Sequence, residues 1–356
     1  MSKPRVAIVG CGYWGHNLVR NFLELKDVEV KAVCDFDLSA LARMKRRYPA
    51  VEPCSNYDDI LSDSRIDAVI IATPVSTHYP FARKALQRSK HVLVEKPLAT
   101  SSSQALDLID LADRQGKVLM VDHTFLYTGA VRHIKSLLDS GEVGDLLYFD
   151  SVRISLGLVQ SDINVLWDLG PHDFSIMNYL CDRDPVSISA TGMKHLGCPF
   201  ENIAYVSVRF EDNLIAHFHL NWLAPVKVRT TLIGGSKKMI VYNDMETSEK
   251  VKVYDKGISM NHDPEHRERM LTGYRNGDMR APNLDTGEAL RLMARDFVDA
   301  IVEKRPPVSD GDAGYRVVRL LELAQLSMVQ NGRPVEVRCP KHPTNGSVLT
   351  LAEVSA

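Results

Sequence analysis

The sequence has no long hydrophobic run and no surplus of charge of one sign. No stretch approaches the roughly 18 consecutive apolar residues that a membrane-spanning helix needs, so we expect no membrane segment. Lysine and arginine number 43 against 45 aspartate and glutamate, which gives a net charge of −2 at neutral pH. Proteins that bind nucleic acid or anionic membranes normally carry a basic excess. We therefore expect neither kind of partner.

Cysteine is scarce and lacks the spacing of a metal or disulfide site. Six cysteines are scattered through 356 residues without a CxxC pair, which is typical of reduced thiols in a cytosolic protein. His262 and His266 are spaced like helical metal ligands, but Pro264 between them indicates a solvated loop, and we predict no metal. The first strand is expected to begin at about Arg5, which leaves no room for a secretory leader. We expect a cytoplasmic protein.

The length of the chain exceeds what one hydrophobic core normally supports, so two domains are expected, residues 1–122 and 123–356. The first alternates apolar strands with amphipathic helices. Its strands are predicted at Arg5–Gly10, Val28–Asp35, Ala68–Thr73, His91–Glu95 and Val118–Val121, and its helices at Gly15–Leu25, Leu38–Tyr48, Tyr79–Ser89 and Ser103–Gln115. Continuous apolar strands between helices are typical of an α/β fold with a doubly wound parallel sheet.

The second domain has a different pattern, in which apolar and polar residues alternate between turn signals. Its strands are predicted at Leu146–Leu156, Ser187–Gly192, Ala204–Phe210, Asn213–Trp222, Val226–Gly234, Lys238–Tyr242 and Lys250–Tyr254, and its helices at Ala130–Ser140, Asp168–Leu180, Glu288–Glu303 and Asp312–Gln330. This alternation predicts an α+β domain with a large, open, mostly antiparallel sheet. Residues 259–285 are polar and are expected to form a surface excursion. The last helix, at about 312–330, is a candidate to pack back on the first domain.

A glycine pattern follows the first predicted strand. Gly10-x-Gly12-x-x-Gly15 opens the first helix, and Asp35 ends the next apolar run. In a dinucleotide-binding fingerprint the first glycine permits the tight turn, the second lets the backbone approach a pyrophosphate, and the third lets helix and strand pack closely. The alternative is a tight turn without a ligand, which does not require the carboxylate. We therefore predict a Rossmann domain that binds a dinucleotide.

Asp35 favours NAD over NADP, because a carboxylate accepts from the ribose 2′-hydroxyl and repels a 2′-phosphate. Arg43 and the basic run at 45–47 follow on the next predicted helix and could hold that phosphate. A solvated basic helix face is the simpler interpretation of these residues. We predict NAD, with NADP as the less favoured cofactor.

Two further predicted strands end in residues that can carry chemistry. Thr73 and Pro74 end one strand, and Glu95, Lys96 and Pro97 end the next. A doubly wound sheet binds its ligand beyond the carboxyl ends of its strands, so Lys96 would point into the cofactor crevice. Pro97 fixes the turn, and a cis peptide bond before it is possible. The alternative is a solvated loop lysine.

The second group of candidates lies at the start of a helix in the second domain. Asp168 and His172 are four residues apart, so both can face one side of the helix, and Pro171 suits a first helical turn. An imidazole there titrates near neutral pH, as proton transfer requires. The alternative is that Asp168 only caps the helix and that His172 is exposed in its first turn.

Taken together, these motifs resemble the glucose-fructose oxidoreductase/inositol dehydrogenase (Gfo/Idh/MocA) family over nearly the whole chain. The motifs are Gly10-x-Gly12-x-x-Gly15, Ala72-Thr73-Pro74-x-x-x-His78, His91-Val-Leu-Val-Glu95-Lys96-Pro97 and Asp168-x-Gly-x-His172. The resemblance implies a Rossmann domain followed by an open-sheet domain, NAD or NADP, and oxidation or reduction of a sugar or cyclitol carbinol. It implies that Lys96, Asp168 and His172 are catalytic and that Glu95 contacts the nicotinamide ribose. The cofactor-binding residues that it implies are Gly10, Gly12, Tyr13, Trp14, Gly15, Asp35, Thr73, Pro74, His78, Glu95 and Lys96.

In the mechanism that follows, hydride leaves the carbinol carbon for the nicotinamide while a base removes the hydroxyl proton. His172 is the first candidate for the base. Lys96 would stabilise negative charge on the same oxygen, and Asp168 would orient the pair. The roles of His172 and Lys96 can also be exchanged.

Within this family, the chain resembles members that act at C3 of a UDP-N-acetylhexosamine or its uronic acid. The candidates to line the sugar pocket are Lys96, Tyr127, Arg153, Gln160, Asn164, Trp167, Asp168 and His172. Core packing is the alternative role for the polar and aromatic ones among them. The rival functions are an inositol or simple-sugar dehydrogenase, a deoxysugar-nucleotide ketoreductase, and a sensor that keeps the fold without the chemistry.

One predicted strand of the second domain mixes aromatic and polar side chains on one face. His217, His219, Asn221 and Trp222 were assigned to that face, which suits a wet protein–protein contact. We therefore expect a homodimer or homotetramer formed through this sheet. Four cations could meet a diphosphate, but a place on the solvent face of the sheet or in a subunit contact is the simpler interpretation: Lys227, Arg229, Lys237 and Lys238.

Overall fold

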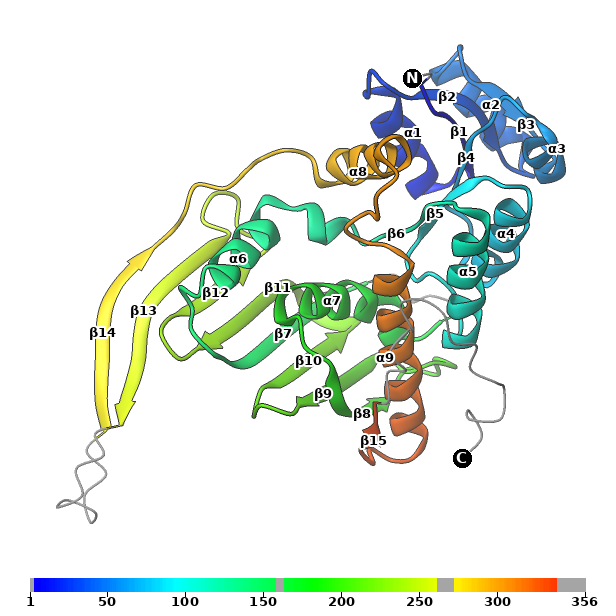
Figure 1. Ribbon diagram of the computed structural model, residues 1–356. Helices are drawn as coiled ribbons and strands as arrows, with labels where there is room; N and C mark the ends of the chain where they lie inside the picture. The colour runs from blue at the N-terminus through cyan, green and yellow to red at the C-terminus, as the bar shows by residue number, and fades with distance from the viewer. Residues whose placement is uncertain (1–2, 158–162, 261–271, 338–356) are drawn as a thin grey trace.

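The computed structural model describes residues 3–157, 163–260 and 272–337. These residues form two sheets joined by helices that pack on both (Figure 1). Gln160, His262, His266 and Cys339 lie outside the described residues. The other five cysteines are free thiols.

The first sheet has six parallel strands in the order β3-β2-β1-β4-β5-β6, as the apolar strand pattern predicts. Its strands are β1 (Arg5–Val9), β2 (Glu29–Cys34), β3 (Glu52–Cys54), β4 (Ala68–Ile71), β5 (His91–Glu95) and β6 (Leu119–Asp122), and its helices are α1 (Tyr13–Leu23), α2 (Leu38–Arg47), α3 (Tyr57–Ser62), α4 (Val75–Gln87) and α5 (Ser102–Gln115). The central strands are almost completely buried, because helices cover both faces. The short β3 and α3 were not predicted. A strand of three residues and a helix of six residues are too short to show a clear hydrophobic periodicity.

The second sheet has nine strands in the order β14-β13-β12-β11-β7-β10-β9-β8-β15. These strands are β7 (Leu146–Leu156), β8 (Pro185–Met193), β9 (Ile203–Phe210), β10 (Ile215–Asn221), β11 (Leu223–Gly235), β12 (Met239–Asn243), β13 (Val251–Met260), β14 (Thr272–Arg280) and β15 (Val335–Glu336). The pairing is antiparallel except between β7 and β10. The associated helices are the 3₁₀ helix η1 (Thr124–Tyr127), α6 (Gly129–Asp139), α7 (Val165–Cys181), α8 (Ala289–Glu303) and α9 (Gly311–Val329).

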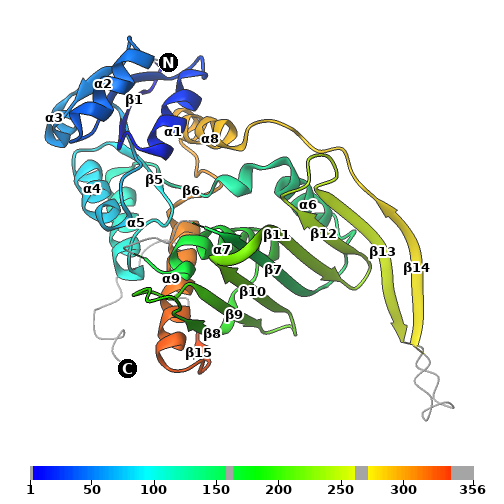
Figure 2. The ribbon, with the colours of Figure 1, turned by 180° about the vertical axis from the view of Figure 1, so that it is seen from behind.

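The polar region 259–285 is mostly exposed where the structure describes its side chains, as expected, but it also contains a strand that was not predicted. Its residues 272–280 form β14, which pairs with β13 and stands out from the body of the protein (Figures 1 and 2). Residues 275–280 are exposed. A strand that is exposed over residues 275–280 needs no alternation of apolar and polar residues there, so this part of the sequence has no strand pattern.

The last two helices connect the sheets. α8 packs against α1, where Phe22 and Phe297 make an edge contact with centroids 6.4 Å apart. α9 packs against α5 and β6 on one side and against α7 and β8 on the other. Just before α9, the Val121 N–H donates to the Ser309 carbonyl, and the Ser309 hydroxyl donates back to the Val121 carbonyl. The segment that leads into α9 thus closes the free edge of β6.

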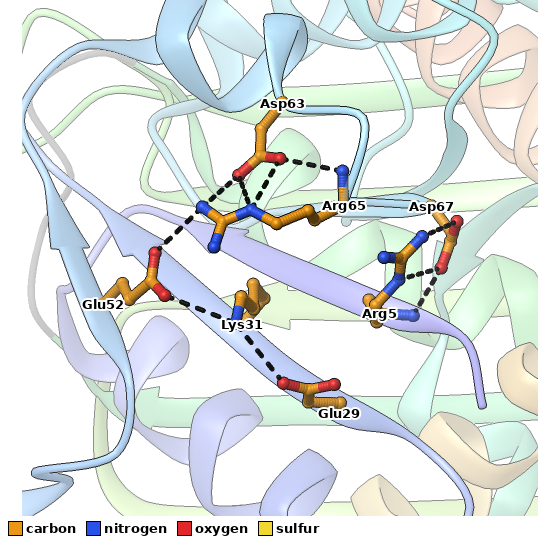
Figure 3. Close-up of polar contacts among 7 residues, drawn as sticks. All are labelled: Arg5, Glu29, Lys31, Glu52, Asp63, Arg65 and Asp67. Carbon is orange, nitrogen blue, oxygen red and sulfur yellow. Dashed lines mark hydrogen bonds and ion pairs between the residues drawn. The ribbon is translucent and has the colours of Figure 1, made fainter. Parts of the chain in front are cut away.

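Ion pairs join the amino-terminal ends of the first strands (Figure 3). Lys31 lies between Glu29 and Glu52, and Arg65 connects Glu52 to Asp63. A separate pair, Arg5 with Asp67, joins the start of β1 to the segment before β4. Exposed pairs of this kind contribute little to stability, because water and salt screen them. They lie at the end of the sheet opposite the carboxyl ends of its strands.

His91, at the start of β5, makes the stability of the protein sensitive to acid. Its Nδ1 accepts the Val118 N–H at 3.0 Å, so the ring must be neutral there. Burial, and then the charge of Lys117, lower the pKa of His91 to about 4. An unfolded histidine titrates near pH 6.5. Between these values the unfolded chain binds more protons, so the free energy of unfolding falls as the pH falls.

We expect His91→Asn to reduce this sensitivity, because an amide oxygen accepts the same hydrogen bond without titrating. The loss of unfolding free energy between pH 7 and pH 5 should shrink by about 1–2 kcal/mol. Urea denaturation of both proteins at the two pH values measures the difference. An equal loss in both proteins would contradict the assignment.

Candidate active site

The glycine turn between β1 and α1 is closely packed on one side and open on the other. Gly10 has a φ of +97°, and a β-carbon on it would lie 2.3 Å from the Ala72 carbonyl oxygen. A β-carbon on Gly15 would lie 1.8 Å from the Gly10 carbonyl oxygen, so neither position admits a side chain. A β-carbon on Gly12 would meet nothing within 4 Å. The open space above the amino end of α1 fits a pyrophosphate.

Asp35 lies at the carboxyl end of β2, beside this turn. Its Oδ2 accepts the Cys11 N–H at 2.6 Å, and its Oδ1 accepts the Asp37 N–H at 2.9 Å. Each carboxylate oxygen keeps a second lone pair that can accept a ribose hydroxyl. Tyr13 and Trp14 are exposed at the start of α1 and contact each other edge to face. The turn, the carboxylate and the aromatic pair thus border one space.

His78 joins two loops at the carboxyl ends of neighbouring strands. Its Nδ1 lies 2.8 Å from the Pro97 carbonyl oxygen, and its Nε2 lies 2.8 Å from the Thr73 carbonyl oxygen. The ring is buried in α4, so it positions these loops and does not present a free nitrogen to a cofactor. Thr73 and Pro74 lead directly into α4, and the peptide bond between Lys96 and Pro97 is cis.

Lys96 reaches from the first domain to Asp168 in the second. Its Nζ donates to the Asp168 carbonyl oxygen at 2.7 Å and to Oδ1 of the same residue at 3.2 Å. Trp222 Nε1 donates to the other carboxylate oxygen at 3.2 Å. An ammonium has three hydrogens, so one hydrogen of Lys96 is left for a substrate oxygen.

Asp168 and His172 lie on successive turns of α7, as their spacing predicts. The helix begins earlier than expected, because Asn164 caps it and Val165 is its first residue. Pro171 therefore lies inside the helix, not in its first turn, and that expectation was wrong. A proline at this position removes the helical hydrogen bond to the carbonyl four residues before it.

The surroundings of His172 keep its ring neutral. Its imidazole makes an edge contact with Phe125, with centroids 5.1 Å apart, and its Nδ1 is buried without a hydrogen-bond partner. Burial, and then the charges of Lys96, Arg153 and Arg229, hold the pKa of His172 well below its ordinary value. A neutral imidazole can accept a proton from a hydroxyl group.

Two carboxyl groups are buried beneath Lys96. Glu95 and Asp122 are paired across β5 and β6, and each has an oxygen without a partner. Burial raises the pKa of Glu95 well above its ordinary value and that of Asp122 to about 6. One shared proton would satisfy both oxygens and leave a single negative charge near the ammonium. Glu95 also accepts the Lys96 N–H, and its contact with a ribose stays a prediction.

The structure does not bring every candidate to this site. The Tyr127 hydroxyl is buried and donates to Asp296 at 2.8 Å. The Asn164 side chain caps α7 and donates to Gln325 at 2.6 Å. Both side chains therefore hold helices together. Trp167 is half-buried and packs against both hydrophobic cores.

Three contributors to the site were not predicted. Trp222 was expected on the solvent face of the sheet but is buried and holds Asp168. Ala216, Phe218 and Leu220, the even-numbered residues of β10, are also buried. Continuing this alternation to position 222 would have predicted that Trp222 is buried. Arg229 was not placed at the catalytic centre, since a diphosphate contact, the solvent face of the sheet and a subunit contact were the roles considered for it. The structure places it opposite the buried Arg153 in β7 and beside Phe125. Phe125 is half-buried between these groups.

Comparison with known proteins agrees with this geometry. Residues 4–123 match the family described as "Oxidoreductase family, NAD-binding Rossmann fold", and residues 131–241 match the GFO/IDH/MocA C-terminal domain. A curated relative, the dTDP-3,4-didehydro-2,6-dideoxy-alpha-D-glucose 3-reductase of Saccharopolyspora spinosa, is 33% identical over 172 residues. That match covers 48% of this chain and about half of the relative, 52%.

Solved structures share the fold over nearly the whole chain. UDP-N-acetylglucosamine 3-dehydrogenase GnnA from Acidithiobacillus ferrooxidans superposes with a TM-score of 0.78 at 23% identity, and the match covers 92% of this chain and 98% of that one. GenD2 from gentamicin A biosynthesis, in complex with NAD, gives a TM-score of 0.80 at 22% identity over 95% of this chain and 97% of that one.

The fold and the site define an NAD-binding oxidoreductase. The chain belongs to the Gfo/Idh/MocA oxidoreductase family, whose two domains it contains in order.

Among the residues that the structure describes, no helix combines the length and hydropathy needed to cross a membrane. In the same part of the chain, no three histidine, cysteine or acidic side chains gather as metal ligands.

Asp35 should set the choice between the two dinucleotides. We expect Asp35→Ser to lower kcat/KM with NAD and to raise it with NADP, because the change removes a hydroxyl acceptor and a repulsive charge. The ratio should move by about 10- to 100-fold. Asp37→Ser is the matched control, because Asp37 caps α2 and is not the carboxylate held against the turn. An unchanged ratio in Asp35→Ser would exclude Asp35 from cofactor selection.

Proposed function

We propose that this enzyme transfers hydride between a sugar carbinol carbon and the nicotinamide of NAD, with a nucleotide sugar as substrate. The observation that carries the proposal is the contact of Lys96 with Asp168 beside His172, at the carboxyl end of β5. The position beyond the strand ends is where a doubly wound sheet binds its ligand. NAD, when bound, supplies the hydride acceptor or donor.

The residues have distinct roles in this reaction. The free hydrogen of Lys96 stabilises negative charge on the carbinol oxygen, and the neutral imidazole of His172 takes the proton. Asp168 fixes the direction of the ammonium and is itself fixed by Trp222. The same groups act in reverse during reduction, with protonated His172 as the acid.

The substrate proposal is a UDP-N-acetylhexosamine or its uronic acid, with reaction at C3. A cavity of about 750 Å³ is lined by Tyr242, Asp244 and Lys250 among others. It does not include Lys96, Asp168 or His172, and its link to them is the hydrogen bond that Asp244 accepts from Arg229. The fold of a UDP-N-acetylglucosamine 3-dehydrogenase supports this class. A second candidate is reduction of a deoxysugar nucleotide, which the sequence similarity to a dTDP-sugar 3-reductase favours.

Removal of either central group should abolish most of the turnover. We expect Lys96→Met and His172→Ala each to lower kcat by about 10²- to 10⁴-fold, with NAD binding retained. Lys84→Met, an exposed lysine in α4, is the matched control and should keep full activity. Steady-state kinetics and calorimetric NAD titration measure the two effects. Near-normal turnover in both variants would rule out this site.

The pH profile gives a further readout on the same proteins. Because the pKa of His172 lies below its ordinary 6.5, its neutral form persists as the pH falls through that value. The kcat/KM for oxidation should therefore stay level down to about pH 6.5 and fall only below it. His172→Ala should remove the acid limb that belongs to this residue.

We also propose that two copies of the chain associate through the outer face of the second sheet. α6, α7 and α9 lie on the side of this sheet that faces the first domain, and none of the described helices packs on its other side (Figures 1 and 2). Tyr205 stacks on His219 there, with centroids 4.5 Å apart, and Ile215 and Leu232 are partly exposed nearby. Such a face suits burial against a second copy.

A charge on this face should separate the copies. We expect wild-type protein to sediment as a dimer or tetramer, and Leu232→Asp to sediment as a monomer, because the buried contact would hold an unpaired carboxylate. Leu38→Asp, at an exposed position in α2, is the control that should leave the assembly intact. A monomeric wild-type protein would contradict the proposal.

A further inference from the structure

Two arginines lie directly opposite each other on the inner face of the second sheet. Arg153 in β7 and Arg229 in β11 occupy the same antiparallel register position. Arg153 points toward α7, where it meets Asp173, so Arg229 shares that face. Like charges at opposed positions destabilise a sheet. The pair therefore requires anionic partners on this side.

The protein itself supplies part of that negative charge. Asp173 accepts from Nε and Nη2 of Arg153 at 2.8 and 2.9 Å, which balances one guanidinium. Nη1 of Arg153 has no hydrogen-bond partner, although the residue is only 6% exposed. A buried, charged donor without an acceptor is costly. It indicates an acceptor that the protein chain does not provide.

The positive charge of the second arginine, Arg229, is neutralised less completely than that of Arg153. Arg229 Nη1 donates to Asp244 at 3.2 Å, and Lys250 Nζ lies 3.2 Å from the same carboxylate. One negative charge thus serves two cations. The Arg229 side chain is 34% exposed, so its guanidinium is accessible to a ligand.

Both guanidinium groups lie close to the proposed reaction centre. The Phe125 ring has Arg153 Cζ 4.7 Å and Arg229 Cζ 5.8 Å from its centroid. The same ring contacts His172. Asp244, the partner of Arg229, lines the 750 Å³ cavity. A sugar whose carbinol lies at His172 would therefore place a neighbouring substituent against the arginines.

We infer that Arg153 and Arg229 form an anion-recognition site for the substrate, which binds a carboxylate or phosphate group attached to the reacting sugar. The inference rests on the proposed function and names its substrate class as acidic. A planar guanidinium pairs with such oxygens through two parallel hydrogen bonds. The glycine turn at α1 takes the cofactor phosphates, so this site is left for the substrate.

Arg229→Gln is the test variant, because Arg229 is partly exposed and its loss leaves the buried pair of Arg153 with Asp173 intact. Arg229→Lys keeps the charge without the planar fork, and Arg88→Gln removes an exposed arginine at the end of α4 as a control. Thermal unfolding of each variant checks the fold. The kinetic readout is kcat/KM with NAD for UDP-N-acetylglucosamine and for its uronic acid.

We expect Arg229→Gln to lower kcat/KM about 10- to 100-fold for the acidic substrate, with Arg229→Lys intermediate and Arg88→Gln unchanged. If the recognised group is a sugar carboxylate, kcat/KM for UDP-N-acetylglucosamine, which lacks that carboxylate, should change less than about threefold. If the recognised group is the diphosphate, Arg229→Gln should lower kcat/KM by the same factor for both nucleotide sugars. No change with either substrate would overturn the inference.

A binding experiment separates this inference from the proposed function. Calorimetry on the NAD-loaded protein would use D-glucuronate, pyrophosphate and D-glucose as probes. We expect wild-type protein to bind one of the two anions at least about tenfold more tightly than Arg229→Gln, and to bind glucose equally. That result without any hydride transfer would sink the proposed function alone. Equal anion binding by both proteins, or none by wild type, would overturn the anion site even if turnover is observed.

Discussion

The contact between the Lys96 ammonium and Asp168 is the constraint on which the rest of the site depends. Lys96 belongs to the parallel sheet and Asp168 to a helix of the second domain, and Trp222 fixes Asp168 from a third element. The ammonium has a defined direction only while these elements keep their positions. The packing of α8 and α9 across both sheets is therefore part of the active site, although neither helix supplies a reacting group.

Electrostatic balance explains why so many charges can lie close together here. Burial, and then three nearby cations, hold the pKa of His172 below its ordinary value. Each of these cations has a carboxylate partner within reach. Beneath them, burial raises the pKa of both Glu95 and Asp122, which favours one negative charge between the two groups over two. Asp244 is divided between two cations.

Much of this fold could be predicted from local sequence patterns. A strand that is buried on both faces is continuously apolar, and a strand that is buried on one face alternates apolar and polar residues. The ranges of β5 and β7 were predicted to the residue, whereas β14 was missed because its residues 275–280 are exposed and show no apolar alternation. The three central residues carry recognisable motifs. The roles of Tyr127 and Asn164 could not be predicted, since their partners lie 169 and 161 residues away in sequence. Only the tertiary fold brings such partners together.

The closure of the β6 edge by Ser309 has a consequence for how the chain is made. Synthesis on the ribosome delivers all six strands of the first sheet long before residue 309. Until then, the main-chain amides and carbonyls of Val121 face water, as an unpaired edge that can template association with other nascent chains. The first domain thus matures in two stages, separated by the synthesis of nearly two hundred residues. Protection by a chaperone is most useful during that interval.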